Sequence, residues 1–210
     1  MHSPPLLGKL MIDKLEAIHG KDGNGQRWDV SGWYGSQLNR VWLKSEGDRN
    51  DNTTESASLE ALASHAIAPF WDAQIGLRHD FASNGMPERD WAAIGIKGIA
   101  PYWFELEATA YVGNHSRSAL SLKASYELRI TQKVLLEPEI ETRAYGRDDM
   151  ERNIGKGLAS ADAGLRLRYE IHRQFAPYVG VSHTWLFGNT NALAPIGATT
   201  EWLAGLRLWY

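Results

Sequence analysis

The sequence contains no cysteine among its 210 residues, which excludes disulfide bonds, thiolate metal ligands and a cysteine nucleophile. It also has no apolar run of about 18 residues, so it predicts no transmembrane helix. Positive charge is not in excess: the formal net charge is -3, and nucleic-acid binding is not expected as the main task. The amino terminus lacks a charged segment followed by an apolar core, so we expect that a secretion signal is already missing.

Large amphipathic aromatic residues are abundant instead, with 9 Trp and 8 Tyr. The clearest pattern runs from Phe104 to Val112, where apolar residues alternate strictly with polar ones such as Glu105 and Glu107. A period of two is typical of a β-strand, and about ten residues is the length that a tilted strand needs to cross a bilayer. Aromatic residues at strand ends are favoured at membrane interfaces. We therefore expect the apolar face to contact lipid and the charged face to line a polar lumen.

Segments of this kind recur along the whole chain. Short connections alternate with long ones rich in Gly, Asn and charge, as in outer-membrane barrels whose termini both lie in the periplasm. The first segment has the weakest pattern, because residues 10–19 follow neither phase throughout. The sequence thus predicts an all-β fold: a transmembrane antiparallel up-and-down β-barrel of about 12 strands with a polar lumen. The predicted strands are 9–19, 27–35, 39–47, 57–68, 72–81, 91–100, 104–113, 119–130, 134–145, 158–171, 176–187 and 201–210.

Several strings in the chain resemble the copper resistance protein B family, whose members are outer-membrane proteins of copper-handling systems. They are IDKLEA at 12, RVWLKSEG at 40, HAIAPFWDAQIGLRHDF at 65, GIAPYWFELEATAYVG at 98, TQKVLLEPEIE at 131 and GLRLRYEIHRQFAPYVGV at 164. The terminal Tyr210 is similar to the aromatic signal by which such barrels are recognised for assembly. The resemblance covers residues 10–210, the expected barrel domain. Family members commonly carry a flexible amino-terminal extension rich in Met and His, and residues 1–9 are expected to be a short stub of it.

The resemblance implies a copper-resistance or copper-homeostasis role in the cell outer membrane. Copper ions are the implied cargo or bound ligand, and no catalytic cofactor is expected. The implied partners are outer-membrane lipid and lipopolysaccharide and periplasmic copper-handling proteins, without nucleic acid, and the protein is expected to be a monomer. An enzyme is not expected, because the pairs His79-Asp80 and Ser182-His183 are strand neighbours that point to opposite faces.

Charged residues on the predicted strands between 91 and 171 are the main candidates for a site in the lumen. Their carboxylates can attract a cation at a constriction while the basic residues narrow the path, which predicts binding and passive conduction of copper through an acidic lumen. Alternatively, they form a charge ladder that only satisfies a polar interior, in a structural or copper-sequestering barrel with a blocked lumen. The carboxylates are Glu105, Glu107, Glu127, Glu137, Glu139, Glu141 and Glu170, and the basic residues are Lys97, Lys123, Arg129, Arg143, Arg166 and Arg168.

Imidazole and thioether groups suit copper, and five such side chains map to strand ends or loops on the extracellular side. They share no recognised ligand spacing, so ordinary polar loop residues are the alternative. An acidic stretch after Lys44 is expected in an extracellular loop, where it would make the mouth electronegative and concentrate cations. The candidate metal ligands are His19, His79, Met86, His115 and Met150, and the acidic loop residues are Glu46, Asp48, Asp51 and Glu55.

Overall fold

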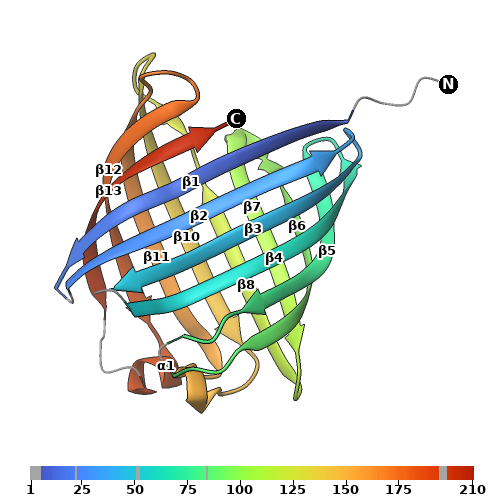
Figure 1. Ribbon diagram of the computed structural model, residues 1–210, viewed down its shortest axis with the longest axis vertical. Helices are drawn as coiled ribbons and strands as arrows, with labels where there is room; N and C mark the ends of the chain where they lie inside the picture. Colours follow the sequence, from blue (N-terminus) through green and yellow to red (C-terminus); the bar gives the residue numbers. More distant parts are fainter. Residues whose placement is uncertain (1–5, 22, 51–52, 84, 194–197) are drawn as a thin grey trace.

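A computed structural model describes residues 6–21, 23–50, 53–83, 85–193 and 198–210. They form a closed antiparallel β-barrel with strongly tilted strands (Figure 1). The strands are β1 (Leu7–Gly20), β2 (Gly23–Gly35), β3 (Asn39–Asn50), β4 (Thr53–Ala68), β5 (Trp71–Asp80), β6 (Arg89–Ala100), β7 (Phe104–Gly113), β8 (Arg117–Ser125), β9 (Leu128–Arg129), β10 (Val134–Tyr145), β11 (Gly157–Tyr169), β12 (Phe175–Leu186) and β13 (Thr199–Trp209).

Neighbouring strands pair in chain order around the ring, and β1 pairs with β13 to close it. The strand β8 breaks off before Tyr126 and Glu127 and resumes as the short β9, and both pair with β10. Because β8 and β9 act as one interrupted strand, the predicted 12-stranded barrel is confirmed. Every predicted strand segment lies on a strand of the structure.

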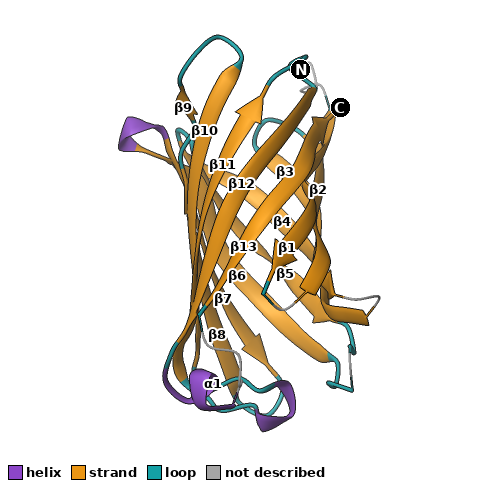
Figure 2. Cartoon of the chain, turned by 90° about the vertical axis from the view of Figure 1, so that its left-hand side faces the viewer, coloured by secondary structure: helices purple, strands orange, loops and turns teal. Residues whose placement is uncertain are grey.

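The two ends of the barrel carry different connections (Figure 2). The start of β1, the end of β13 and the short turns lie at one end, including the 3-10 turn η1 (Pro101–Trp103); we call this the turn end. The opposite end, the loop end, carries the long connections with η2 (Met150–Arg152) and α1 (Gly188–Leu193). The expected alternation of short and long connections is present only in part, because the strand bounds leave short connections at the loop end between β1 and β2, β3 and β4, and β7 and β8. None of the described helices is long and apolar enough to cross a membrane.

Large apolar side chains cover the outside of the barrel. Ile94 and Val112 are each 61% exposed, although residues of this kind are usually buried in soluble proteins. Their strand neighbours Ala93 and Tyr111 are buried and face the interior. An apolar outer face with inward-facing neighbours is the pattern of an outer-membrane barrel in contact with lipid.

A β-bulge in β1 explains why its sequence pattern is weak. The register of β1 against β13 shifts between Ile12 and Leu15, and its register against β2 shifts between Ile12 and Lys14. The bulge places both Asp13 and Lys14 in ion pairs inside the barrel, so the inward positions change from odd to even numbers. The strand itself begins at Leu7, within the range 1–9 that the sequence assigned to a stub.

One part of the barrel interior resembles the core of a soluble protein. Trp42, Leu62, Trp91, Ala93 and Tyr111 pack together from β3, β4, β6 and β7; we call them the aromatic cluster. The rings of Trp91 and Tyr111 meet edge to face with their centroids 6.5 Å apart. Charged side chains occupy most of the remaining lumen.

Candidate functional site: a lumen crossed by ion pairs

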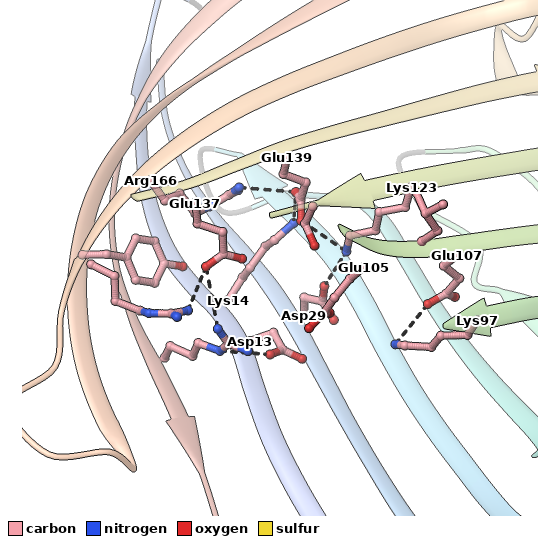
Figure 3. Close-up of a pocket in the computed structure, with 15 residues that line it drawn as sticks. Asp13, Lys14, Asp29, Lys97, Glu105, Glu107, Lys123, Glu137, Glu139 and Arg166 are labelled. Carbon is pink, nitrogen blue, oxygen red and sulfur yellow. Dashed lines mark hydrogen bonds and ion pairs between the residues drawn. The ribbon is translucent and has the colours of Figure 1, made fainter. Parts of the chain in front are cut away.

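Glu139 of β10 is the centre of the charged network in the lumen. Its carboxylate oxygens lie 2.6 Å from Lys14 Nζ of β1, 3.3 Å from Arg166 Nη1 of β11 and 3.5 Å from Lys123 Nζ of β8. Figure 3 shows these side chains meeting inside the barrel from different walls. Three cations around one carboxylate leave Glu139 without free negative charge.

Two ion pairs connect strands that lie opposite one another in the ring. Lys123 Nζ of β8 is 3.4 Å from Asp29 Oδ2 of β2. Arg143 Nη2 of β10 is 3.9 Å from Glu46 Oε2 of β3. The strand order places six strand steps between β8 and β2, and between β10 and β3, when β8 and β9 count as one. These side chains therefore cross the lumen and do not merely link neighbouring strands.

A second set of charged side chains lies beside the aromatic cluster. Glu107 accepts a short hydrogen bond from Lys44 of β3 and lies 3.1 Å from Lys97 Nζ of β6. Lys44 is also 3.9 Å from Glu60. Lys44 was missed as a lumen residue, although its alternation with Trp42 along the strand indicates an inward position.

A belt of ion pairs lies toward the turn end. Arg168 contacts Glu137 at 2.7 Å and Glu127 at 2.5 Å. Arg207 of β13 reaches across to the same Glu127 at 2.8 Å and to Asp13 at 3.3 Å. Arg207 was not predicted as a lumen residue, although the alternation of apolar and polar residues along the last strand indicates an inward position.

The most deeply buried pair joins Glu16 and Arg166. Glu16 is 2% exposed, and its Oε1 accepts hydrogen bonds from Arg166 Nε at 2.7 Å and from the Tyr178 hydroxyl at 3.0 Å. The other oxygen lies 3.9 Å from Arg27 Nη1. The sequence did not predict Glu16, because the bulge in β1 changes the phase just before it.

Three cavities follow one another along the lumen. The vestibule, about 690 Å³, opens at the turn end and shares Lys97 and Glu105 with a central cavity of about 90 Å³. An upper cavity of about 130 Å³ lies toward the loop end. The two inner volumes are below the range of about 300–1,000 Å³ that small-molecule pockets occupy. The central and upper cavities share five lining residues, which we call the waist: Lys14, Asp29, Lys123, Glu139 and Arg166.

The central cavity has balanced charge and differs from the expected acidic lumen. Six carboxylates and six basic side chains line it. Four of these carboxylates and four of the basic residues were among the predicted lumen charges, and β1, β2 and β13 add two of each, so neither sign is in excess. The six carboxylates are Asp13, Asp29, Glu105, Glu107, Glu137 and Glu139, and the six basic residues are Lys14, Lys97, Lys123, Arg166, Arg168 and Arg207.

Most of the predicted lumen carboxylates have a basic partner. Beyond the groups above, Glu141 is 2.7 Å from Arg143. Glu170 is 3.5 Å from Arg129 at the turn end, where the Arg129 side chain is more than half exposed. Glu105 has no ion pair among the described residues. The predicted charges therefore meet one another mainly between neighbouring strands, as a charge ladder would, and the pairs that cross the lumen involve residues from the rest of the ring such as Lys14, Asp29 and Glu46.

The connection that contains η2 is attached to the barrel at the loop end. Asp149 lies 3.0 Å from Arg89 Nε and 3.2 Å from Arg117 Nε, and Arg152 Nη1 is 3.2 Å from Asp80. Burial opposes ionisation of Asp149, but the hydrogen bonds of Arg89 and the positive charge of the three arginines outweigh it and keep the Asp149 pKa below its usual range. These contacts anchor the connection to β5, β6 and β8.

The structure spreads the candidate copper ligands over the loop end. His19 pairs with Asn24 at 2.6 Å and His79 with Asp90 at 2.7 Å, through neighbouring strands. Within the described ranges, no three His, Cys, Asp or Glu side chains are grouped closely enough to hold a metal ion. Of the other three candidates, His115 lies in the β7–β8 turn, Met86 in the β5–β6 connection and Met150 at the start of η2, and all five stay predictions.

The acidic stretch after Lys44 belongs mainly to a strand, which corrects the expected loop. Glu46 and Asp48 lie on β3, because β3 and β4 extend as a hairpin toward the loop end. Asp48 is 2.5 Å from Arg27, so its charge is compensated. Glu55 lies on β4, and Asp51 lies outside the described residues.

Comparisons with known proteins agree with this architecture. The family model of the copper resistance protein B precursor (CopB) matches residues 6–210. The chain belongs to this family. It is 39% identical to copper resistance protein B of Escherichia coli and 40% identical to a copper resistance protein B homolog of Pseudomonas syringae pv. tomato. Each match covers 100% of this chain and 72% of the relative.

Solved structures support the fold at much lower sequence identity. The NanC porin is 11% identical with a TM-score of 0.62, over 95% of this chain and 98% of the porin. The KdgM porin is 12% identical with a TM-score of 0.54, over 96% and 98% of the two chains. The family and the porin-like barrel together assign the protein to copper resistance in the outer membrane.

Proposed function

We propose that the protein binds copper ions and conducts them passively through its lumen. The observation that carries this proposal is the row of three cavities, which share lining residues from the turn end to the loop end. The two inner cavities have room for water and small ions but not for larger solutes. The family supplies copper as the cargo.

Carboxylates with incomplete pairing are the proposed contact points for the ion. Glu105 lines both the vestibule and the central cavity. Asp162 lines the upper cavity and accepts a hydrogen bond from Thr184 at 2.5 Å, with no ion pair among the described residues. A carboxylate without a close ion pair, in a lumen of reduced dielectric, attracts a cation more strongly than one in bulk water. Glu139, with three cationic neighbours, is a weaker contact point than these two.

The proposed partners in the cell follow from the family and from the apolar outer face of the barrel. Lipid and lipopolysaccharide would contact the apolar exterior, and periplasmic copper-handling proteins would exchange copper with the turn end. We propose that a monomer is the working unit, because one chain closes the barrel. The role is non-enzymatic in this proposal.

A second candidate function is a structural or copper-sequestering barrel with a blocked lumen. The ion pairs that cross the lumen favour it, because each one occupies space on the proposed path. The two candidates differ in one measurable property, the passage of copper.

Copper uptake into liposomes containing the purified protein tests the proposal. We expect uptake to exceed that of protein-free liposomes and to follow the copper gradient without an energy source. Liposomes with the denatured protein serve as the control for nonspecific leakage. Equal uptake in all three preparations would overturn conduction and leave the blocked barrel.

A further inference from the structure

We propose that the waist sets the charge selectivity of the lumen, with Lys14 and Lys123 as movable basic groups and Glu139 as their counter-charge. The inference deepens the proposed function, because it assumes an ion path through the lumen. It concerns which sign of charge passes, and so can be tested with ions other than copper.

The position of the waist makes it the control point of the path. Its five residues line both the central and the upper cavity, so an ion moving between the two cavities must pass them. Lys123 contributes most to this, because it contacts both Asp29 on the opposite wall and Glu139. Figure 3 shows Lys123 between these two carboxylates.

The three basic residues of the waist are not equally fixed. Arg166 is 5% exposed and bonded to the buried Glu16, which also holds the Tyr178 hydroxyl. The Lys14 and Lys123 side chains are 12% and 28% exposed, and lysine carries its charge on a flexible four-carbon stem. The two lysines can therefore leave the path while Arg166 stays in place.

The charge balance at the waist is close, so a single neutralisation should shift it measurably. Three basic groups face two carboxylates there, and Glu139 contacts all three. Neutralising Glu139 leaves basic groups that attract anions and repel cations. Neutralising Lys14 has the opposite effect, because Glu139 then faces one cation fewer. Opposite shifts from two residues in one ion pair distinguish a selectivity role from a general loss of structure.

Reversal potentials in planar bilayers with a potassium chloride gradient test the inference. Lys14→Gln and Lys123→Gln should each raise the ratio of potassium to chloride permeability, and Glu139→Gln should lower it, by about fivefold or more. The matched control is Lys133→Gln, because Lys133 is an exposed residue of a connection at the turn end and lies outside the waist. Heat-modifiable gel migration checks that each variant forms the barrel.

The outcomes separate this inference from the proposed function. An unchanged permeability ratio in all folded variants, or the same direction of shift for Lys14→Gln and Glu139→Gln, overturns the selectivity role. Absence of potassium chloride conductance in every protein also overturns it. Opposite shifts without any copper uptake would support the waist as a selectivity element and contradict copper conduction.

Discussion

The aromatic cluster and the waist fill the same barrel interior by different physical means. Trp42 and Leu62 of the aromatic cluster pack against neighbouring apolar side chains, which gain stability by leaving water. Lys14 and Glu139 of the waist are stabilised by the opposite charge of partners on other strands. In the aromatic cluster, loss of one side chain leaves a cavity, whereas in the waist a buried charge that loses its partner is left uncompensated.

This difference gives the aromatic cluster and the waist separate roles. The aromatic cluster narrows the lumen with groups that offer an ion few charges. The waist presents alternating charges along the cavities, where an ion can exchange with a side chain. Substitutions in the aromatic cluster and in the waist should therefore differ in the size of their effect and in the property that they change.

The largest loss of stability is expected for Arg166→Leu in the waist. Removing the guanidinium leaves the buried Glu16 and Glu139 with less compensation, and loss of one partner of a buried ion pair costs about 3–5 kcal/mol. The free energy of unfolding, measured by urea titration in lipid vesicles, should fall by that amount.

A second variant sharpens this prediction. Adding Glu16→Gln to Arg166→Leu removes the uncompensated charge and should restore part of the lost stability. Equal destabilisation by the single and double variants would show that packing, and not charge, makes Arg166 important.

A smaller loss is expected for Leu62→Ala in the aromatic cluster. Leu62 is 1% exposed, and truncation of a buried leucine typically costs about 2–4 kcal/mol through lost burial and a residual cavity. The same urea titration measures it, and the ratio of potassium to chloride permeability should stay at the wild-type value. A changed permeability ratio would contradict the separation of roles.

The smallest effect concerns the η2 connection and its dependence on pH. Because the pKa of Asp149 is lowered in the folded protein, its contribution to stability is present above the ordinary aspartate value of about 3.9 and is lost as pH falls through the lowered value. The chain has no cysteine, so a fluorophore on Met150→Cys reports this connection selectively. Its anisotropy should be constant from about pH 7 to pH 5 and fall only below about pH 4. With Asp149→Asn, it should be low throughout.

Much of the barrel could be predicted from sequence because strand alternation is a local property. The period of two from Phe104 to Val112 assigned the lipid and lumen faces, and the lengths of the connections assigned the ends. The bulge at Asp13 and Lys14 escaped prediction, since one extra residue changes the phase without any distinctive residue type.

The partners of the lumen charges could not be predicted for a different reason. Alternation assigns Lys123 to the inner face, but its contact with Asp29 depends on register and tilt around the whole ring. The same holds for Arg207, which joins the last strand to Glu127. The expectation of an acidic lumen counted charges without their contacts, whereas most of the predicted carboxylates are paired with basic side chains.

The central claim, that copper passes through the lumen, is tested most directly by blocking the lumen with a side chain. Ser182 lines the upper cavity on β12, whereas Val179 on the same strand is 58% exposed on the outer face. In liposome copper-uptake assays, Ser182→Trp should reduce uptake toward the protein-free level, while Val179→Trp should match wild type. Equal uptake by both folded variants and wild type would contradict passage through the lumen.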